Sequence, residues 1–474
     1  MKNLNPVLVR EIRQAVRNRV IIIALHLYLL AMCGVCLYYL LGLSGIPLHK
    51  VGPDLLAVLL YTVSYSTAAA VVLHSGGRLI LERIHEDLMY SSTLTPLKIT
   101  VGKVLSGFVI SLLFYSTTLP FLAIAYQFQG VDIREILIKA LYTFCLIQVF
   151  HLLVLAAFAG VNSIPSAVFR GVLLLPVAAG LWLFCTFIME DMYEFSTSGE
   201  QVIVLTMVLS FLFVILPIFL FFVTKCQFDP PESNRMWSIR VSATAIFLPT
   251  FLLCTIIDLL PISVSLRVGL TFIWFILALY PFAIFCFLPM GERTQYGRRL
   301  RRNIPENFWG RIFVFPFYSG DVNGMIWMSL WIWISIFVVV FLARLNVDVE
   351  FKELSSGFAS VLLCFNYAVA SIVLWRQFFY RYVSKEWIGL ITFGLIVLGA
   401  FVSITAPGFR VDTPIWEMEL IFVPNFFWSM QGPSNNYHPQ LAFALLGFIV
   451  CEIRLAVMAV RQFRSFVRYE PDRL

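Results

Sequence analysis

The sequence predicts an all-α protein, a polytopic transmembrane helical bundle in the inner membrane with both termini in the cytoplasm. Composition is the first reason, because 60% of the 474 residues are hydrophobic and only 13% are charged, which is too apolar for a soluble globular chain. Apolar runs of about 20 residues, the length that crosses a bilayer, recur along the chain between short polar loops. The third reason is a bias of lysine and arginine toward alternate loops.

About twelve apolar runs are long enough to be interpreted as spans. Each is expected to be one α-helix, because a backbone amide in hydrocarbon needs a partner within its own segment. The expected spans cover residues 20–42, 54–77, 104–127, 136–160, 167–189, 202–224, 239–260, 263–288, 325–343, 356–375, 387–406 and 440–460. The sequence between spans shows no short alternating strands of the kind that build membrane barrels.

The orientation follows from where the basic residues fall, since positive charge is retained on the cytoplasmic side. With the N-terminus inside, 27 lysines and arginines fall on the cytoplasmic side and 7 outside, which together account for all 34. The bias persists along the whole chain, so it supports an even number of spans. The net charge of +7 is therefore a signal of topology and requires no nucleic-acid partner.

The first segment, residues 5–19, predicts a helix that lies along the lipid headgroups. Asn5 is a suitable N-cap and Pro6 a suitable first helical residue. An apolar stripe and a basic stripe recur at helical spacing on opposite faces; they are Leu8, Ile12 and Val16, and Arg10, Arg13 and Arg17. The alternative is a plain basic flank that only orients the first span.

The loop after the second span, residues 79–103, predicts a helix, a break and a second helix. Apolar residues share one face of the first helix, while Glu82, Arg83 and Glu86 lie elsewhere around it. A run of serines and threonines interrupts the pattern, and Thr95 followed by Pro96 can begin the helix that leads into the third span. The alternative is a solvated connector whose charges only keep it out of the membrane.

At these two segments the sequence resembles the ABC-2 type permeases, the membrane-spanning subunits of ABC exporters. Members of this family often open with an amphipathic elbow helix that contains an Asn-Pro pair, an Arg-Glu pair and further arginines. Their first cytoplasmic loop often carries Thr-Pro-Leu followed by Gly-Lys. The matching residues here are Asn5, Pro6, Arg10, Glu11, Arg17 and Arg19, and then Thr95, Pro96, Leu97, Gly102 and Lys103. Arg13 belongs to the same predicted elbow helix.

The resemblance covers about residues 1–226 and implies a six-span permease-like domain there. The other six expected spans, in residues 227–474, lie beyond it and form a second membrane domain of unknown purpose. No second elbow helix or second Thr-Pro-Leu loop is evident in the latter. One departure concerns the acidic residue ahead of Thr-Pro-Leu, which is either Glu86 or Asp87 here.

The resemblance implies that the chain forms a translocation path and is driven by a separate ATPase. Residues Glu82, Arg83, Glu86, Asp87, Thr95, Pro96, Leu97, Gly102 and Lys103 would form the loop that contacts the ATPase. A second permease subunit, identical or different, would complete the path. In agreement with this division, the sequence contains no phosphate-binding G-x-x-x-x-G-K-[ST] loop. We expect no catalytic, metal or cofactor site in this chain.

Polar residues inside spans are a further candidate site, because burying them in hydrocarbon is expensive. Gln148 and His151 lie one turn apart in the fourth span. They could relay protons in an ion-coupled secondary transporter, or form interhelical hydrogen bonds that fix packing. A membrane-embedded transferase is the third class considered, with the acidic residues 190–200 as its nearest candidates.

Overall fold

The computed structural model describes residues 5–41, 48–83, 94–128, 130–159, 171, 209–230, 233–258, 296–345, 351–379, 395 and 437–468. All regular secondary structure in these ranges is helical, which confirms the all-α class for this part of the chain. Five of the described segments are long and apolar enough to cross a membrane. The chain is therefore treated as a membrane-embedded protein.

The five segments are Arg19–Leu41, Val51–Glu82, Pro96–Gln127, Ile133–Phe158 and Phe211–Phe228. They coincide with the first four expected spans and with the sixth. In the second half, four helices occupy the positions of expected spans, as given below. The expected spans 167–189, 263–288 and 387–406 lie almost wholly outside the described residues, so the count of twelve and the orientation stay predictions.

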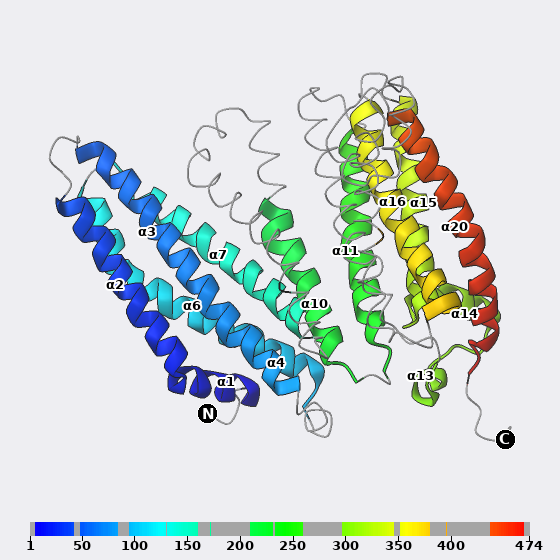
Figure 1. The fold of residues 1–474 in the computed structure, drawn as a ribbon, viewed down its shortest axis with the longest axis horizontal. Coiled ribbons are helices and arrows are strands. Elements are labelled where there is room, and N and C mark those ends of the chain that lie inside the picture. Colours follow the sequence, from blue (N-terminus) through cyan, green and yellow to red (C-terminus); the bar gives the residue numbers. More distant parts are fainter. Residues whose placement is uncertain are drawn as a thin grey trace. The chain divides into compact units, whose positions relative to one another are not determined.

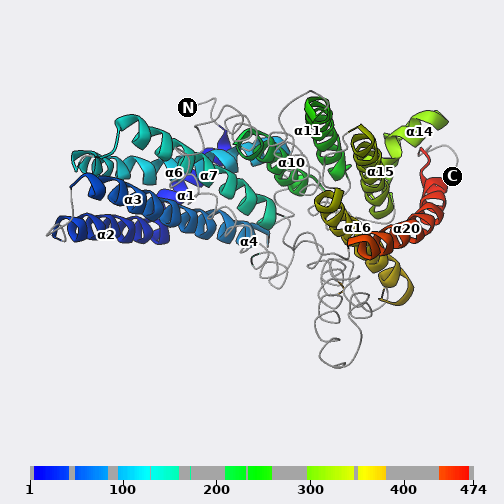
Figure 2. The same ribbon diagram turned by 90° about the horizontal axis from the view of Figure 1, so that it is seen from above.

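The chain divides into two compact units, Met1–Pro230 and Pro231–Leu474, which are described separately. In the first unit, α3 (Leu48–Val71) continues through the π-helical turn η1 (Val72–Gly76) into α4 (Gly77–Arg83). This helix lies between α2 (Arg19–Leu41) and α7 (Ile133–Phe158), as Figures 1 and 2 show.

Three further elements complete this unit. The long helix α6 (Pro96–Gln127) packs against α3 and α7, and the π-helical turn η3 (Phe211–Ile215) leads into α10 (Leu216–Phe228), which packs on α7. The first helix, α1 (Pro6–Arg17), lies across the end of α2 and contacts α6 (Figure 1). An N-terminal helix that crosses the ends of the spans is the arrangement expected for an interfacial helix.

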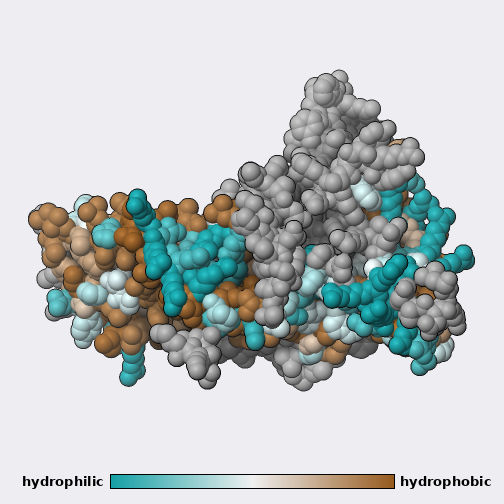
Figure 3. All heavy atoms as spheres, turned by 90° about the horizontal axis from the view of Figure 1, so that it is seen from below, coloured by the Kyte–Doolittle hydropathy of each residue, from teal (hydrophilic) through white to brown (hydrophobic). Residues whose placement is uncertain are grey.

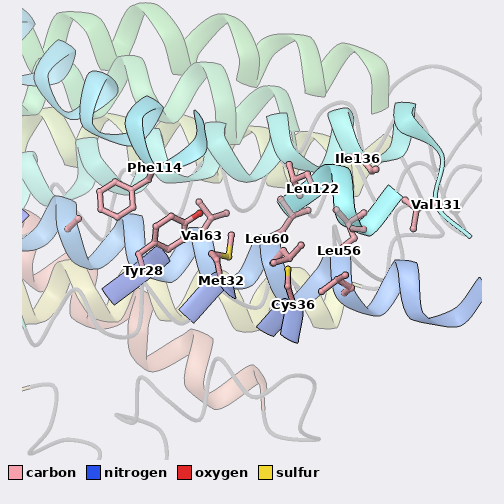
Figure 4. Packing of buried hydrophobic residues seen from close by; sticks show 14 of the residues in the cluster. Tyr28, Met32, Cys36, Leu56, Leu60, Val63, Phe114, Leu122, Val131 and Ile136 are labelled. Atoms are coloured by element: carbon pink, nitrogen blue, oxygen red, sulfur yellow. The ribbon is translucent and has the colours of Figure 1, made fainter. Parts of the chain in front are cut away.

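The core of the first unit consists of buried apolar side chains that recur about one helical turn apart along the packed helices (Figure 4). The buried residues of α2 include Tyr28, Met32 and Cys36, at positions i, i+4 and i+8. They meet buried residues of α3, α6 and α7, among them Leu56, Leu60, Val63, Phe114, Leu122 and Ile136. The opposite face of α2 exposes large apolar side chains such as Leu30. In lipid both faces are equally apolar, so packing contacts, and not removal from water, select which face is buried.

The second unit contains a group of long helices that Figure 1 shows side by side. They are α11 (Arg235–Asp258), α15 (Asp321–Leu345), α16 (Phe351–Leu374), which continues into the π-helical turn η6 (Trp375–Phe379), and α20 (Tyr437–Ser465). Of these, α16 and α20 make the most extensive contact.

Short elements precede α15: α13 (Arg298–Arg302), α14 (Phe308–Val314) and the 3-10 turn η5 (Phe315–Phe317). The buried Arg240 of α11 holds η5 in place, because its guanidinium donates hydrogen bonds to the carbonyls of Pro316 and Tyr318. A buried guanidinium that binds backbone carbonyls satisfies polar groups that would otherwise be unpaired in an apolar setting.

Candidate functional site

The two sequence segments that carry the family resemblance meet where α1 crosses the beginning of α6. Asn5 is the N-cap of α1, as predicted, and its Oδ1 accepts a hydrogen bond from the amide of Val7 at 3.0 Å. Its Nδ2 also donates to the carbonyl of Lys98 in α6 at 2.6 Å. Thr95 caps α6 in turn, with Oγ1 accepting from the amide of Lys98 at 3.4 Å. One asparagine therefore both starts α1 and ties it to α6.

A glycine lets α1 lie directly on α6. A Cβ atom at Gly102 would stand only 2.7 Å from the Cβ of Val7, which is closer than packed carbon atoms allow. The face of α1 that turns toward α6 carries Val7, Glu11 and Ala15, all buried. The predicted apolar stripe lies on another face of α1, where Val16 is exposed and Leu8 and Ile12 are half-buried, and its contact with the lipid headgroups stays a prediction.

Five charged side chains of α1, α4 and α6 meet at this crossing, and we call them the elbow cluster: Arg10, Glu11, Arg78, Glu82 and Lys103. The carboxylate of Glu11 is 3.2 Å from the Lys103 ammonium, 3.5 Å from Arg78 and 3.2 Å from Arg10. The carboxylate of Glu82 accepts from the same ammonium at 2.6 Å and from Arg78 at 3.3 Å, and it also pairs with Arg10. Each carboxylate therefore meets all three cations.

Glu11 is the most deeply buried acid of the cluster, with 2% of its surface exposed. Burial raises the pKa of this carboxyl, but Lys103, Arg78 and Arg10 lower it by more, so the pKa lies below the ordinary value of 4.5. Glu11 is thus held as a carboxylate at neutral pH. Figure 3 views the end of the molecule that carries α1, where hydrophilic residues of this unit gather among hydrophobic ones.

A second polar group lies next to the elbow cluster, at the π-helical turn η1. The Oγ of Ser75 lies 3.2 Å from the Nε2 of the fully buried His151. His74 of the same turn is buried and lies 3.9 Å from the Glu11 carboxylate. The imidazole of His151 packs against the backbone of α6 at Gly107, where any Cβ would overlap the ring. A π-helical turn inserts a residue into the helix and re-aims these side chains.

The structure brings together many, but not all, of the residues predicted from sequence. Asn5, Arg10, Glu11, Glu82, Thr95, Gly102 and Lys103 meet at the crossing of α1 and α6. Pro6 is the first residue of α1, and Pro96 is the first residue of α6. Arg83 is the last residue of α4. Three other predicted residues are exposed: Arg13, Arg17 and Leu97. Glu86 and Asp87 lie outside the described residues.

Gln148 and His151, the polar pair of the fourth expected span, differ in their contacts. His151 contacts Ser75, whereas the amide nitrogen of Gln148 has no hydrogen-bond partner among the described residues. Sequence reasoning missed Arg78 and His74. The spacing of Arg78 and Glu82, one helical turn apart, was the available signal, because such a pair is a common stabilising contact within a helix.

The chemistry of the site is electrostatic. Within the part of the chain that the structure describes, no three histidine, cysteine, aspartate or glutamate side chains are grouped so as to hold a metal ion. The elbow cluster instead joins three helices through ion pairs around the buried side chains of Glu11 and Lys103, where loss of one partner would leave a buried charge uncompensated. Comparison of the chain with known protein families, with curated proteins and with solved structures finds no match.

Proposed function

We propose that this chain is the permease subunit of an ATP-driven ABC exporter, a multi-pass protein of the inner membrane with both termini in the cytoplasm. In this proposal it forms the translocation path with a second permease subunit, identical or different. ATP hydrolysis takes place on a separate ATPase subunit, which binds the first cytoplasmic loop. The chain itself performs no covalent chemistry.

One observation carries the proposal: the two motif segments that suggest the family lie against each other. The Asn-Pro and Arg-Glu residues of α1 contact the residues that follow Thr-Pro-Leu, through Asn5 to Lys98, Val7 to Gly102 and Glu11 to Lys103. Each motif alone is short. The contact between them gives both motifs the same structural role, which is to fix the elbow helix α1 to α6, the helix that follows the loop.

This arrangement supports a coupling role because ion pairs and packing contacts join the two ends of the loop to each other and to α1. The loop leaves α4 at Arg83 and returns at the start of α6, and Glu82 and Lys103, near those two ends, are joined by an ion pair of 2.6 Å. A partner that displaces the loop would move α4, α6 and α1 together. Packed helices shift as units because packed cores deform little.

The proposal predicts that reversing two acidic charges in the loop weakens binding of an ATPase. In the double variant Glu86→Lys/Asp87→Lys, copurification of an ABC ATPase from detergent extracts should fall, because polar contacts at an interface are replaced by repulsion. Both residues lie outside the expected spans, so insertion into the membrane should be unchanged. A topology reporter fused to the C-terminus checks that insertion.

The matched control is Glu194→Lys/Glu200→Lys, which makes the same change of charge in a loop expected on the other side of the membrane. It should leave copurification intact. The permease proposal is wrong if no ATPase accompanies the well-folded wild-type chain, or if the Glu86/Asp87 reversal leaves a bound ATPase unaffected. In that case the buried Ser75 and His151 pair would favour the alternative of an ion-coupled secondary transporter.

A further inference from the structure

The second unit carries a basic surface that the proposed function does not use. It is formed by α13, by α14 and by the end of α20, and we call it the arginine patch. Its arginines are Arg298, Arg299, Arg301, Arg302, Arg311, Arg461, Arg464 and Arg468. Figure 1 shows α13 and α14 next to the end of α20, and Figure 3 shows hydrophilic residues gathered on this face of the unit.

An aromatic cluster fixes the three elements of the patch to one another. Phe466, which follows α20, is fully buried and lies with ring centroids 5.2 Å from Tyr296 and 5.2 Å from Phe315. Phe463 of α20 stacks edge to face on Phe315, and the guanidinium of Arg311 lies 5.1 Å above its ring. Edge-to-face pairs and cation–π contacts are directional, so the backbone that presents the arginines is held in a defined position.

The charge of this surface is strongly unbalanced. Residues 296–320 and 461–468 contain eight arginines and a single acid, Glu306, an excess of seven positive charges. Glu306 is paired with Arg468. Arg299 and Arg302 of α13 are exposed, lie on one helical face and form no ion pair with another described residue. Exposed guanidinium groups attract anions and donate charge-assisted hydrogen bonds to phosphate oxygens.

Large apolar side chains stand beside these charges. Trp309 is 70% exposed and Phe313 is 73% exposed, and Phe308 next to them is also exposed. They belong to α14, which directly precedes α15 with only η5 and a short turn between. Tryptophan next to arginine at the end of a membrane helix is the composition of the bilayer interface, where an aromatic ring enters the acyl boundary and a cation meets the headgroup.

We propose that the arginine patch is a binding surface for anionic phospholipid headgroups. Arg299 and Arg302 contact the headgroup phosphates, while Trp309 and Phe313 enter the outer part of the acyl region. An acidic protein would satisfy the arginines equally, but the exposed aromatic side chains of α14 beside them favour lipid. The inference is independent of the permease proposal, because its test needs no ATPase.

The test uses the full-length protein purified in a neutral detergent, with lipid binding followed by native mass spectrometry. Phosphatidylglycerol and phosphatidylcholine are titrated separately into wild type, Arg299→Gln/Arg302→Gln and Arg299→Lys/Arg302→Lys. Each basic residue near an anionic surface contributes about a fivefold factor in affinity. The Gln variant should therefore bind phosphatidylglycerol about 25-fold more weakly, while the Lys variant retains most of the binding and phosphatidylcholine binding stays the same.

A second variant separates the aromatic contribution from the charge. Trp309→Ala/Phe313→Ala should weaken binding of both lipids alike, because it removes apolar contact and no charge. Arg134→Gln, an exposed arginine at the start of α7, is the control and should change neither titration.

Three results would overturn the proposal. One is equal binding of phosphatidylglycerol by wild type and the Gln variant. Another is displacement of the lipid by inorganic phosphate at the same concentration, which would indicate a site for free phosphate. The third is unchanged lipid binding with loss of a copurifying acidic protein, which would assign the patch to a protein partner.

Discussion

We expect that neutralising Glu11 and neutralising Lys103, the two partners of one ion pair in the elbow cluster, will weaken the attachment of α1 to different extents. Glu11 and Glu82 supply two negative charges, and Arg10, Arg78 and Lys103 supply three positive charges. Glu11→Gln leaves three cations around one carboxylate. Lys103→Gln leaves two carboxylates matched by two arginines. Removing the acid should therefore weaken the attachment of α1 more than removing the base.

The expected free-energy cost of each substitution depends on how deeply the charges are buried. Breaking a buried ion pair by neutralising one partner costs about 3–5 kcal/mol. The side chains of Arg10, Arg78 and Glu82 are 54%, 21% and 24% exposed, so water screens part of the unbalanced charge and the lower end applies. We expect about 3 kcal/mol for Glu11→Gln. Lys103→Gln loses hydrogen bonds to two carboxylates but keeps the charges balanced, so about 1.5 kcal/mol is expected.

Hydrogen exchange of the α1 backbone amides measures this attachment directly, because those amides exchange when α1 leaves α6. A change of about 3 kcal/mol corresponds to a rise of about a hundredfold in their exchange rate. Lys103→Gln should raise it only about tenfold. The double variant should exchange more slowly than the product of the two single effects predicts, because the residues are in contact. The reasoning is refuted if Lys103→Gln has the larger effect, or if the two effects multiply.

Three further predictions use the same crossing of helices and the topology. Because the folded pKa of Glu11 is lowered, its contribution to stability is complete above the ordinary value of 4.5 and is lost as pH falls through the lowered value. The protection factors of the α1 amides, which are exchange rates corrected for the intrinsic effect of pH, should therefore fall in that acid range in wild type but not in Glu11→Gln. Gly102→Ala should force α1 away from α6 and lower thermal stability by about 1–3 kcal/mol, whereas Gly34→Ala, where no atom lies within 4 Å of the added Cβ, should not; equal melting temperatures would contradict the close approach. Cysteines placed near Arg298 should be labelled from the cytoplasmic side and those near Glu194 from outside, and labelling of both from one side would disprove the predicted topology.

Local sequence signals were sufficient for the helices and for their starts. Asn5 and Thr95 were predicted as N-caps, and both side chains accept the backbone amide hydrogen bonds that define a cap. The first four expected spans and the sixth are also helical at the expected positions. These features depend on residues that are neighbours in the chain, so a single sequence contains the information that decides them.

The tertiary structure decided which faces are buried and which charges meet. On α1 the periodicity assigns Leu8, Ile12 and Val16 to the lipid surface, but it does not indicate that Val7, Glu11 and Ala15 form the face buried against α6. Glu11 is buried because Lys103, 92 positions away, supplies a matching charge, and because Gly102 leaves room for α1. Burial of a charge is decided by partners from distant segments and by the space between helices, and neither is readable from local periodicity.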